Sequence, residues 1–175
     1  MFSDPERNIE QLGLSDGNVV VDLGSGSGFY ALAAAKAVAP MGKVYAIDVQ
    51  RDLLDRLKKD AQRMHIRNID IITGNLENLG GSKLRDESVN VVLISNTLFM
   101  VENKEVLIME AKRILKKNGR LFIVDWSGSF GQMGPHAGHV VYKDDAMKLA
   151  QGGGFSFDRE ISAGAHHYGM IFHKR

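Results

Sequence analysis

The chain has 175 residues, a formal net charge of +1 and no cysteine. A chain of this length can form one domain with a sizeable core, and 44% apolar and 25% charged residues are ordinary for a globular protein. The near-zero charge gives no reason to expect a nucleic-acid or membrane partner, and the lack of cysteine excludes disulfides, thiolate metal sites and cysteine nucleophiles.

Strand and helix patterns alternate through the first 125 residues. The expected strands are continuous apolar runs rich in β-branched residues, which is typical of strands covered on both faces in a parallel sheet. Alanine or leucine recurs at helical spacing between them. The predicted strands are 19–23, 44–48, 70–73, 89–94 and 120–125, and the predicted helices are 29–38, 53–64 and 107–115.

The ends of two segments are predicted from breaker and charge signals. Lys116, Lys117, Asn118 and Gly119 are expected to close the helix that includes Leu107, because cations and a following glycine favour a helix C-terminus. The glycine-rich stretch 126–142 predicts a long exposed loop, and 144–151 predicts a short helix.

The C-terminal segment 155–173 predicts a hairpin that turns at Ser162-Ala163-Gly164, and residues 1–17 form an N-terminal arm. The whole pattern predicts a single α/β domain over residues 1–175. We expect a doubly wound, Rossmann-like sheet of seven strands with right-handed crossovers, mostly parallel and ending in the antiparallel hairpin.

A glycine loop and an acidic residue occupy the positions that an adenosine cofactor needs. The loop Gly24-Ser25-Gly26-Ser27-Gly28 joins the first strand to the first helix, where glycines let the backbone approach a ligand and helix N–H groups are available. Asp48 ends the second strand and can accept hydrogen bonds from both ribose hydroxyls. The loop by itself also fits a tight turn without a ligand; the acidic residue after the next strand favours a nucleoside site.

The spacing of the glycines distinguishes two cofactors. The dinucleotide fingerprint would place a third glycine at position 29, where the chain has Phe29. The Asp22 carboxylate near the loop would repel a pyrophosphate but can hold an ammonium group. A cofactor with a ribose at one end and an amino acid at the other is therefore indicated, and S-adenosylmethionine fits that description.

Residues 20–28, 44–48 and 115–121 together resemble the class I S-adenosylmethionine-dependent methyltransferases. The chain is most similar to the ubiquinone/menaquinone-biosynthesis type, over about residues 16–126. The resemblance implies that the glycine loop lies along the methionine part, that Asp48 binds the ribose, and that the residues after the third and fourth strands lie beside the adenine and the methyl group. The family usually has aspartate where Asn75 stands, and asparagine can still accept a hydrogen bond there. The expected cofactor-binding residues are Asp22, Gly24, Ser25, Gly26, Gly28, Asp48, Val49, Gly74, Asn75, Leu76, Ser95 and Asn96.

The methyl acceptor is predicted mainly from what the chain lacks. The fourth strand ends in Ser95-Asn96-Thr97-Leu98 and not in the Asp/Asn-Pro-Pro-aromatic sequence of methyltransferases that act on planar amino groups. Because the chain has no cysteine, it cannot use the covalent route to cytosine C5 or the thiol-dependent methylation of arsenic. We therefore expect a small-molecule O-, N- or C-acceptor, with no nucleic acid.

Candidate catalytic side chains lie in the glycine-rich loop and the hairpin. A His or Tyr there could take a proton from the acceptor, whereas the transfer itself needs mainly alignment. The alternative is that these histidines are solvated loop residues, and His-x-x-His lacks a third ligand, so no metal is expected. The catalytic candidates are His136, His167 and Tyr168; further acceptor-site candidates are Asp125, Trp126, His139, His166, Phe99 and Met100.

The sequence also leads to expectations about what covers the site and about the cellular location. Either the short arm and the 126–141 loop fold over the site or a second subunit does, so a homodimer is possible. The first residues lack the basic head and apolar core of a signal peptide, and no apolar run reaches the roughly 20 residues that cross a bilayer, so we expect a cytoplasmic protein without a membrane partner. Two other functions remain open: a non-catalytic S-adenosylmethionine-binding sensor or partner subunit, and an NAD-dependent oxidoreductase, which Phe29 opposes.

Overall fold

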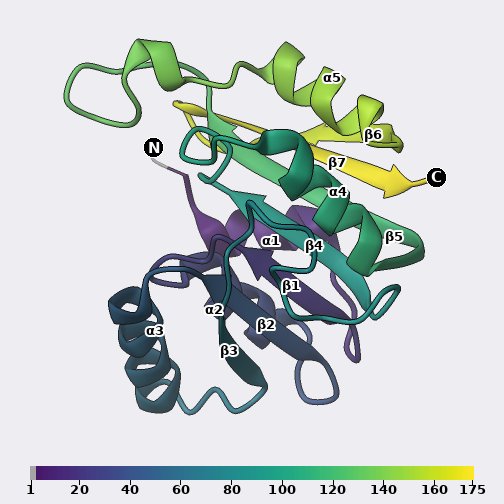
Figure 1. Ribbon diagram of the computed structural model, residues 1–175. Coiled ribbons are helices and arrows are strands. Elements are labelled where there is room, and N and C mark those ends of the chain that lie inside the picture. The colour runs from purple at the N-terminus through teal and green to yellow at the C-terminus, as the bar shows by residue number, and fades with distance from the viewer. Residues whose placement is uncertain (1–2) are drawn as a thin grey trace.

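Strands and helices alternate along residues 3–175, the part of the chain that the computed structural model describes (Figure 1). The strands are β1 (Val19–Leu23), β2 (Lys43–Asp48), β3 (Ile69–Thr73), β4 (Val89–Ser95), β5 (Leu115–Trp126), β6 (Phe155–Ile161) and β7 (His167–Lys174). The helices are α1 (Pro5–Leu12), α2 (Phe29–Ala37), α3 (Arg51–Arg63), α4 (Lys104–Ile114), α5 (Lys143–Gly152) and the 3-10 turn η1 (Ala137–His139).

The seven strands form one sheet in the order β3-β2-β1-β4-β5-β7-β6. Strands β1 to β5 pair in parallel, whereas β7 is antiparallel to both β5 and β6. The predicted α/β fold, with a mostly parallel sheet and a terminal hairpin, is confirmed. The chain leaves β1 toward β2 and β3 and later returns to β4 on the other side, so the carboxyl ends of β1 and β4 border the switch point where such sheets bind ligands.

Two apolar clusters lie on the two faces of the sheet, under helices that Figure 1 shows on either side of it. On one face α1, α2 and α3 pack on the sheet through residues such as Leu12, Ala31 and Leu57. On the other face α4 and α5 pack through residues such as Leu107 and Ala146. Burial of both faces explains why the central strands are continuous apolar runs. The connection from β3 to β4, residues 74–88, is described throughout and contains turns and bends in place of a helix.

The arm contains a helix that the sequence analysis did not assign. Asp4 caps α1 by accepting a hydrogen bond from the Arg7 N–H at 3.2 Å, and Pro5 occupies the first turn. Leu12 is fully buried, and the Asn8 amide donates to the Tyr30 hydroxyl of α2 at 2.7 Å. The arm is therefore docked on α2 from residue 3 onward, and residues 1 and 2 lie outside the described part.

The predicted end of α4, with Lys116 to Gly119 closing the helix, is wrong by about one turn. The helix stops at Ile114, and Leu115 adopts extended angles (φ −70°, ψ 133°) and pairs with Val89. Leu115 is fully buried, so its place in the sheet ends the helix before the lysines. Lys112 and Arg113 supply the cations of the last turn instead.

The terminal region follows the prediction with small shifts. The hairpin β6–β7 spans residues 155–174, and its register shifts between Phe157 and Arg159. The loop after β5 contains a bridge between Phe130 and Met133 followed by η1. Trp126, predicted as the start of the loop, is the last residue of β5 and pairs with His167. Within residues 3–175 no helix combines the length and apolar character that spanning a membrane needs.

Candidate functional site

The glycine loop has a backbone that side chains would disrupt. Gly24, Gly26 and Gly28 have φ values of 80°, 52° and 84°, all left-handed. A Cβ on Gly24 would lie 2.5 Å from the Thr97 hydroxyl oxygen, and one on Gly28 would lie 2.2 Å from a methyl carbon of Leu57. The loop is thus pressed against α3 and the end of β4, and Gly28 leads directly into α2.

Asp48 connects this loop to the end of β2. Its side chain accepts hydrogen bonds from the Gly26 N–H at 2.8 Å and from the Gln50 N–H at 2.9 Å, one on each carboxylate oxygen. The residue is 7% exposed. Each carboxylate oxygen keeps a further lone pair, so the same group can hold the loop and accept from a ribose hydroxyl.

Asp22 is a buried carboxylate beneath the loop. Alternation along β1 places it on the face that α2 covers, and it is fully buried. Neither of its oxygens has a hydrogen-bond partner among residues 3–175. Burial, and next the charge of Asp48, raise the pKa of Asp22 to about 7; weaker interactions with the Ala31 N–H and the Ser95 hydroxyl act in the opposite direction.

Two further polar atoms beside the loop are buried without a partner in the described chain: the Ser25 hydroxyl and the Asn96 side-chain oxygen. Asn96 also has a left-handed φ of 53° directly after β4. Leaving a buried polar group unpaired costs about 1–3 kcal/mol, so a cluster of such groups at a switch point fits a polar ligand. A ligand with an ammonium and a carboxylate would satisfy Asp22 as acceptor and the hydroxyl and backbone N–H groups as donors.

Two adjoining pockets flank the loop, and Gly24 and Met100 line both. The first, of about 430 Å³, runs along the loop and is bordered by the arm. The second, of about 370 Å³, extends over the ends of β2 and β3. The first is lined by Ser3, Pro5, Gly24, Ser25, Gly26, Ser27, Phe29, Tyr30, Ser95, Asn96 and Met100, and the second by Gly24, Asp48, Val49, Gln50, Gly74, Asn75, Leu76, Glu77, Thr97, Met100, Val101 and Glu102.

The structure brings the residues of the predicted cofactor set together around these pockets. Ten of them line one or both pockets, while Asp22 lies beneath the loop and Gly28 caps α2. Sequence reasoning missed Gln50, Glu77 and Thr97, although each follows a strand end closely enough for that position to have flagged it. The sequence predicts the arm as a possible cover, and the docking of α1 on α2 places Ser3 and Pro5 in the wall of the first pocket. The N-terminal arm of the same chain therefore forms part of the wall of the first pocket.

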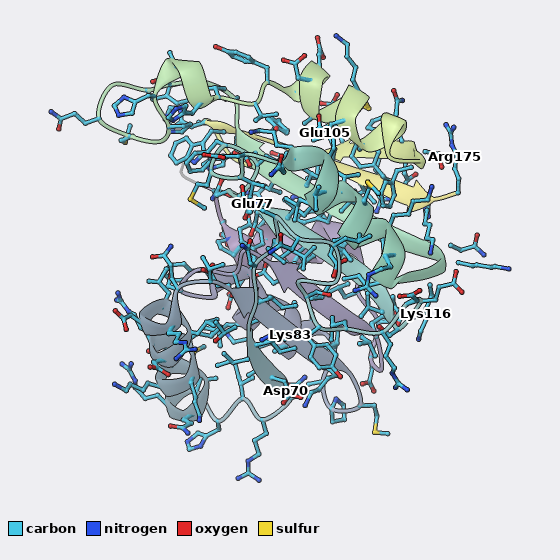
Figure 2. The ribbon with its side chains drawn as sticks, in the orientation of Figure 1. Asp70, Glu77, Lys83, Glu105, Lys116 and Arg175 are labelled. Atoms are coloured by element: carbon cyan, nitrogen blue, oxygen red, sulfur yellow. The ribbon has the colours of Figure 1, made fainter. Side chains whose placement is uncertain are left out.

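The far wall of the second pocket is held by hydrogen bonds between loops. The Asn75 side-chain oxygen accepts from the Glu77 N–H at 3.0 Å, and a Glu77 carboxylate oxygen accepts from the Glu102 N–H at 2.6 Å. Figure 2 shows Glu77 between Lys83 and Glu105, at the junction of the β3–β4 loop with the start of α4. The residues after β3 and those before α4 are thus joined across the pocket.

A family model described as a methyltransferase domain matches residues 14–155. The chain belongs to this methyltransferase-domain family. A solved S-adenosylmethionine-dependent methyltransferase from Aquifex aeolicus is similar over 99% of this chain and 91% of its own, with a TM-score of 0.89 and 25% identity. The predicted class I fold family and its cofactor, S-adenosylmethionine, are confirmed by this membership and this neighbour.

The curated relatives of this methyltransferase domain are longer proteins with different acceptors in their names. An arsenite methyltransferase of Halobacterium salinarum is 30% identical over 64% of this chain and 28% of its own length. A ubiquinone/menaquinone biosynthesis C-methyltransferase of Hydrogenovibrio crunogenus is 34% identical over 68% of this chain and 46% of its own length. The chain thus spans less than half the length of either relative.

Among the candidate acceptor-site residues, His167 lies on the face of the sheet that carries Asp22 and Ser95. Ser95 pairs with Val124, and Trp126, two residues further along β5, pairs with His167, so alternation places Ser95, Trp126 and His167 on one face. The Trp126 and His167 rings are 4.3 Å apart. Both ring nitrogens of His167 are buried and have no hydrogen-bond partner within the described residues, and burial, then His166, lower the pKa of His167.

Tyr168 faces the other side of the sheet and belongs to the cluster under α4 and α5. Its hydroxyl donates to the Val141 carbonyl at 2.9 Å, and burial, followed by the charge of Asp125, raises its pKa. The Tyr168 hydroxyl is thus a buried structural contact on the face of the sheet away from Ser95, and its proton is already donated to a carbonyl, which does not support the predicted catalytic role.

Of the other candidate residues, some are buried and hold neighbouring loops, and others are exposed to solvent. Asp125 is fully buried, accepts from the Leu98 and Trp126 N–H groups at 2.9 and 2.8 Å, and has its pKa raised to about 6 by burial, so it holds the loop that follows β4. His136 and His139 are exposed, with ring centroids 6.4 Å apart. His166 stacks on Phe130 at 4.2 Å, and Phe99 is half-buried beside Met100. In the described chain no group of three or more His, Cys, Asp or Glu side chains has the arrangement to hold a metal ion.

Proposed function

We propose that the protein transfers a methyl group from S-adenosylmethionine to a small-molecule acceptor. The observation that carries this proposal is Asp22, a fully buried carboxylate without a hydrogen-bond partner in the described chain, placed under a glycine loop. A pyrophosphate beside it would add negative charge to an uncompensated negative group, whereas an ammonium would neutralise it. The amino-acid end of the methyl donor supplies that ammonium.

The residues of the two pockets fit the parts of this donor. Ser25 and Asn96 of the first pocket, with Asp22 beneath the loop, would take the ammonium and carboxylate, since their polar atoms lack partners among residues 3–175. In the second pocket Asp48 would accept from the ribose, and the base would lie among Val49, Asn75 and Leu76. The groups that are unpaired in this structure are thereby used by the ligand.

When bound, the donor's sulfonium supplies an electrophilic methyl group for in-line displacement. The protein's own contribution is to align the acceptor at the end of β4 and to hold water away from it. His167 is the residue that we propose takes the acceptor proton: its lowered pKa keeps the imidazole neutral near pH 7, and its unpaired nitrogens can accept. His136 is exposed and is the less suitable candidate.

The acceptor that we propose is a carbon, nitrogen or oxygen nucleophile on a small molecule. Some relatives are named arsenite methyltransferases, but arsenic(III) is a soft ion that thiolates bind, and this chain has no cysteine. The net charge of +1 also gives no broad basic surface for nucleic acid.

Calorimetric titration tests the donor, and methyl-transfer assays test the acceptor. We expect S-adenosylhomocysteine to bind and NADH not to bind; tight NADH binding without a response to S-adenosylhomocysteine would contradict the proposal. Assays with S-adenosylmethionine and a panel of phenols, quinols, amines and arsenite should give product with a non-arsenic acceptor. S-adenosylhomocysteine binding without turnover on any acceptor would favour the non-catalytic sensor.

His167→Gln tests the proposed base. We expect a loss of turnover that is largest near neutral pH, where the imidazole is neutral and a weakly acidic acceptor keeps its proton. Donor affinity should be unchanged, because His167 is not part of either pocket lining. His139→Gln, which changes an exposed histidine of the same region, is the matched control. Equal turnover in wild type and His167→Gln would remove the residue from the mechanism.

A further inference from the structure

A buried acidic side chain outside both pockets holds the β3–β4 loop. Glu110, on α4, is fully buried. Its carboxylate accepts from the Gly80 N–H at 2.7 Å, from the Ser82 N–H at 3.1 Å and from the Ser82 hydroxyl. Arg113, one turn further along α4, donates to the same carboxylate at 2.9 and 2.7 Å. Five donors therefore converge on one carboxylate, which joins α4 to residues 80–82.

The network is fully charged at neutral pH. Burial by itself would raise the pKa of Glu110, but the hydrogen bonds from Arg113, from the Ser82 hydroxyl and from the backbone N–H groups hold it at about 2. Arg113 also pairs with the exposed Asp86. A buried carboxylate that is satisfied in this way fixes geometry, because every displacement of a donor leaves a charge unpaired.

The loop passes this geometry on to the base pocket by direct backbone contact. A Cβ on Gly81 would lie 1.7 Å from the Asn75 carbonyl oxygen, and one on Gly74 would lie 2.3 Å from the Gly81 carbonyl oxygen. The backbone of residues 74–75, which follows β3, and the segment that Glu110 holds are thus in contact without any intervening side chain. Lys83 closes the loop by donating to the Thr73 carbonyl at 2.6 Å.

The opposite wall of the same pocket is attached to the same helix. Glu102, whose N–H donates to Glu77, stands two residues before the start of α4 at Lys104. Figure 2 shows Glu77 beside this start of α4, which Glu105 marks. The α4 segment is therefore joined to the β3–β4 loop at two points: Glu110, on the helix, holds Gly80 and Ser82, and Glu102, two residues before the helix, holds Glu77 of the pocket wall.

We propose that Glu110, with Ser82 and Arg113, is a positioning group that sets the base-binding wall of the cofactor site from α4. This rests on the proposed function, because it takes the second pocket to hold the adenine. The group touches no ligand itself; it keeps Asn75 and Glu77 at the distance from Val49 and Val101 that the flat base requires. Its removal should therefore weaken binding of the base and leave binding of the amino acid and ribose unchanged.

The test is the variant Glu110→Gln, titrated with two ligands, of which one carries adenine on the ribose and the other a hydroxyl in its place. We expect S-adenosylhomocysteine to bind about ten-fold more weakly than to wild type, whereas S-ribosylhomocysteine, which lacks the adenine, changes by less than about two-fold. Glu105→Gln is the matched control, since it removes an exposed carboxylate from the same helix and should leave both affinities at the wild-type value. Equal losses for the two ligands, or no loss for either, would overturn the proposal.

If Glu110→Gln does not fold, the variant Ser82→Ala and amide hydrogen exchange test the same proposal. Ser82→Ala removes one hydroxyl from the network, and we expect the same selective loss at about three-fold. Amide hydrogen exchange should accelerate at residues 76–83 and stay unchanged in β1 and β4; acceleration throughout the sheet would mean a loss of global stability instead. Failure of wild type to bind S-adenosylhomocysteine would sink the proposed function, whereas intact wild-type binding with an unselective Glu110→Gln would sink only this inference.

Discussion

The two halves of the proposed cofactor cleft differ in how their polar groups are paired. Around the glycine loop, oxygens of Asp22, Ser25 and Asn96 are buried and lack partners among the described residues. On the base side, Asn75 and Glu77 each accept a backbone N–H. The first half is completed only by a ligand, and the second is already complete without one.

Because of this difference, the two halves contribute differently to the stability of the ligand-free protein and to the affinity for the ligand. Unpaired buried groups lower the stability of the ligand-free protein, and ligand binding recovers that free energy as affinity. Groups that are already paired contribute rigidity, so the base finds a preformed wall and binding there costs little ordering. Substitutions in the first half should therefore move stability and affinity in opposite directions, and those in the second half in the same direction.

The largest effect is expected for Asp22→Asn. Affinity for S-adenosylhomocysteine should fall about 100-fold, corresponding to roughly 2.7 kcal/mol, because the ammonium loses its counter-charge. At about pH 8 the free energy of unfolding of the ligand-free protein should rise by roughly 1–3 kcal/mol, because a buried unpaired charge is removed. Calorimetry and urea denaturation measure the two, with the exposed Asp52→Asn as control. A less stable variant with intact affinity would reverse the comparison.

Asp48→Ala should have the next largest effect. It removes both the expected ribose acceptor and the hydrogen bond to the Gly26 N–H, so S-adenosylhomocysteine should bind more weakly by about 1–3 kcal/mol. Asp48→Asn keeps an acceptor for one of the two N–H groups and should lose less. An affinity of Asp48→Ala equal to that of wild type would remove the residue from the ribose site.

The pH dependence should isolate Asp22 without a large structural change. Its pKa is raised from 3.8 to about 7 in the folded protein, so between these values the native state binds more protons than the unfolded state. The contribution of Asp22 to stability therefore falls as pH rises through this window, while S-adenosylhomocysteine affinity rises by up to about ten-fold between pH 6 and 8. Asp125, with a pKa of about 6, adds a change of the same sign to stability. Denaturation and titration at four pH values should show the affinity change in wild type and not in Asp22→Asn.

The smallest effect is expected on the preformed side. Asn75→Ala should weaken S-adenosylhomocysteine binding about five-fold and slightly lower stability, since the turn to the Glu77 N–H is also lost. Asn75→Asp keeps that acceptor and should stay closer to wild type. An Asn75→Ala loss as large as that of Asp22→Asn would show that the two halves do not differ as described.

The sequence was sufficient where function depends on local backbone. The left-handed glycines, Asp22 and Asp48 lie within short motifs whose spacing already indicated the methyl donor. Strand alternation could also have separated His167 from Tyr168, which face opposite sides of the sheet, before the structure did.

What the sequence did not reveal depends on contacts between distant segments. Glu110 reads as one more charge on an amphipathic helix, paired with Arg113 at i+3, and its other three donors become visible only when residues 80–82 cross it. Leu115 looked like the last turn of α4 until its pairing with Val89 placed it in the sheet. The Asp4-Pro5 pair is a recognisable helix start, yet the position of α1 beside the pocket follows from Tyr30.

The antiparallel course of β7 has a practical consequence for handling the protein. Because β7 runs against β5, the pairing of Arg120 with His173 brings the C-terminus to the sheet edge opposite the cofactor cleft, where Figure 2 labels Arg175. Ser3, near the other end of the chain, lines the cleft. An affinity tag or a surface-coupling group attached after Arg175 therefore starts away from the proposed cleft, whereas the same group joined to the N-terminal side of Ser3 starts close to it.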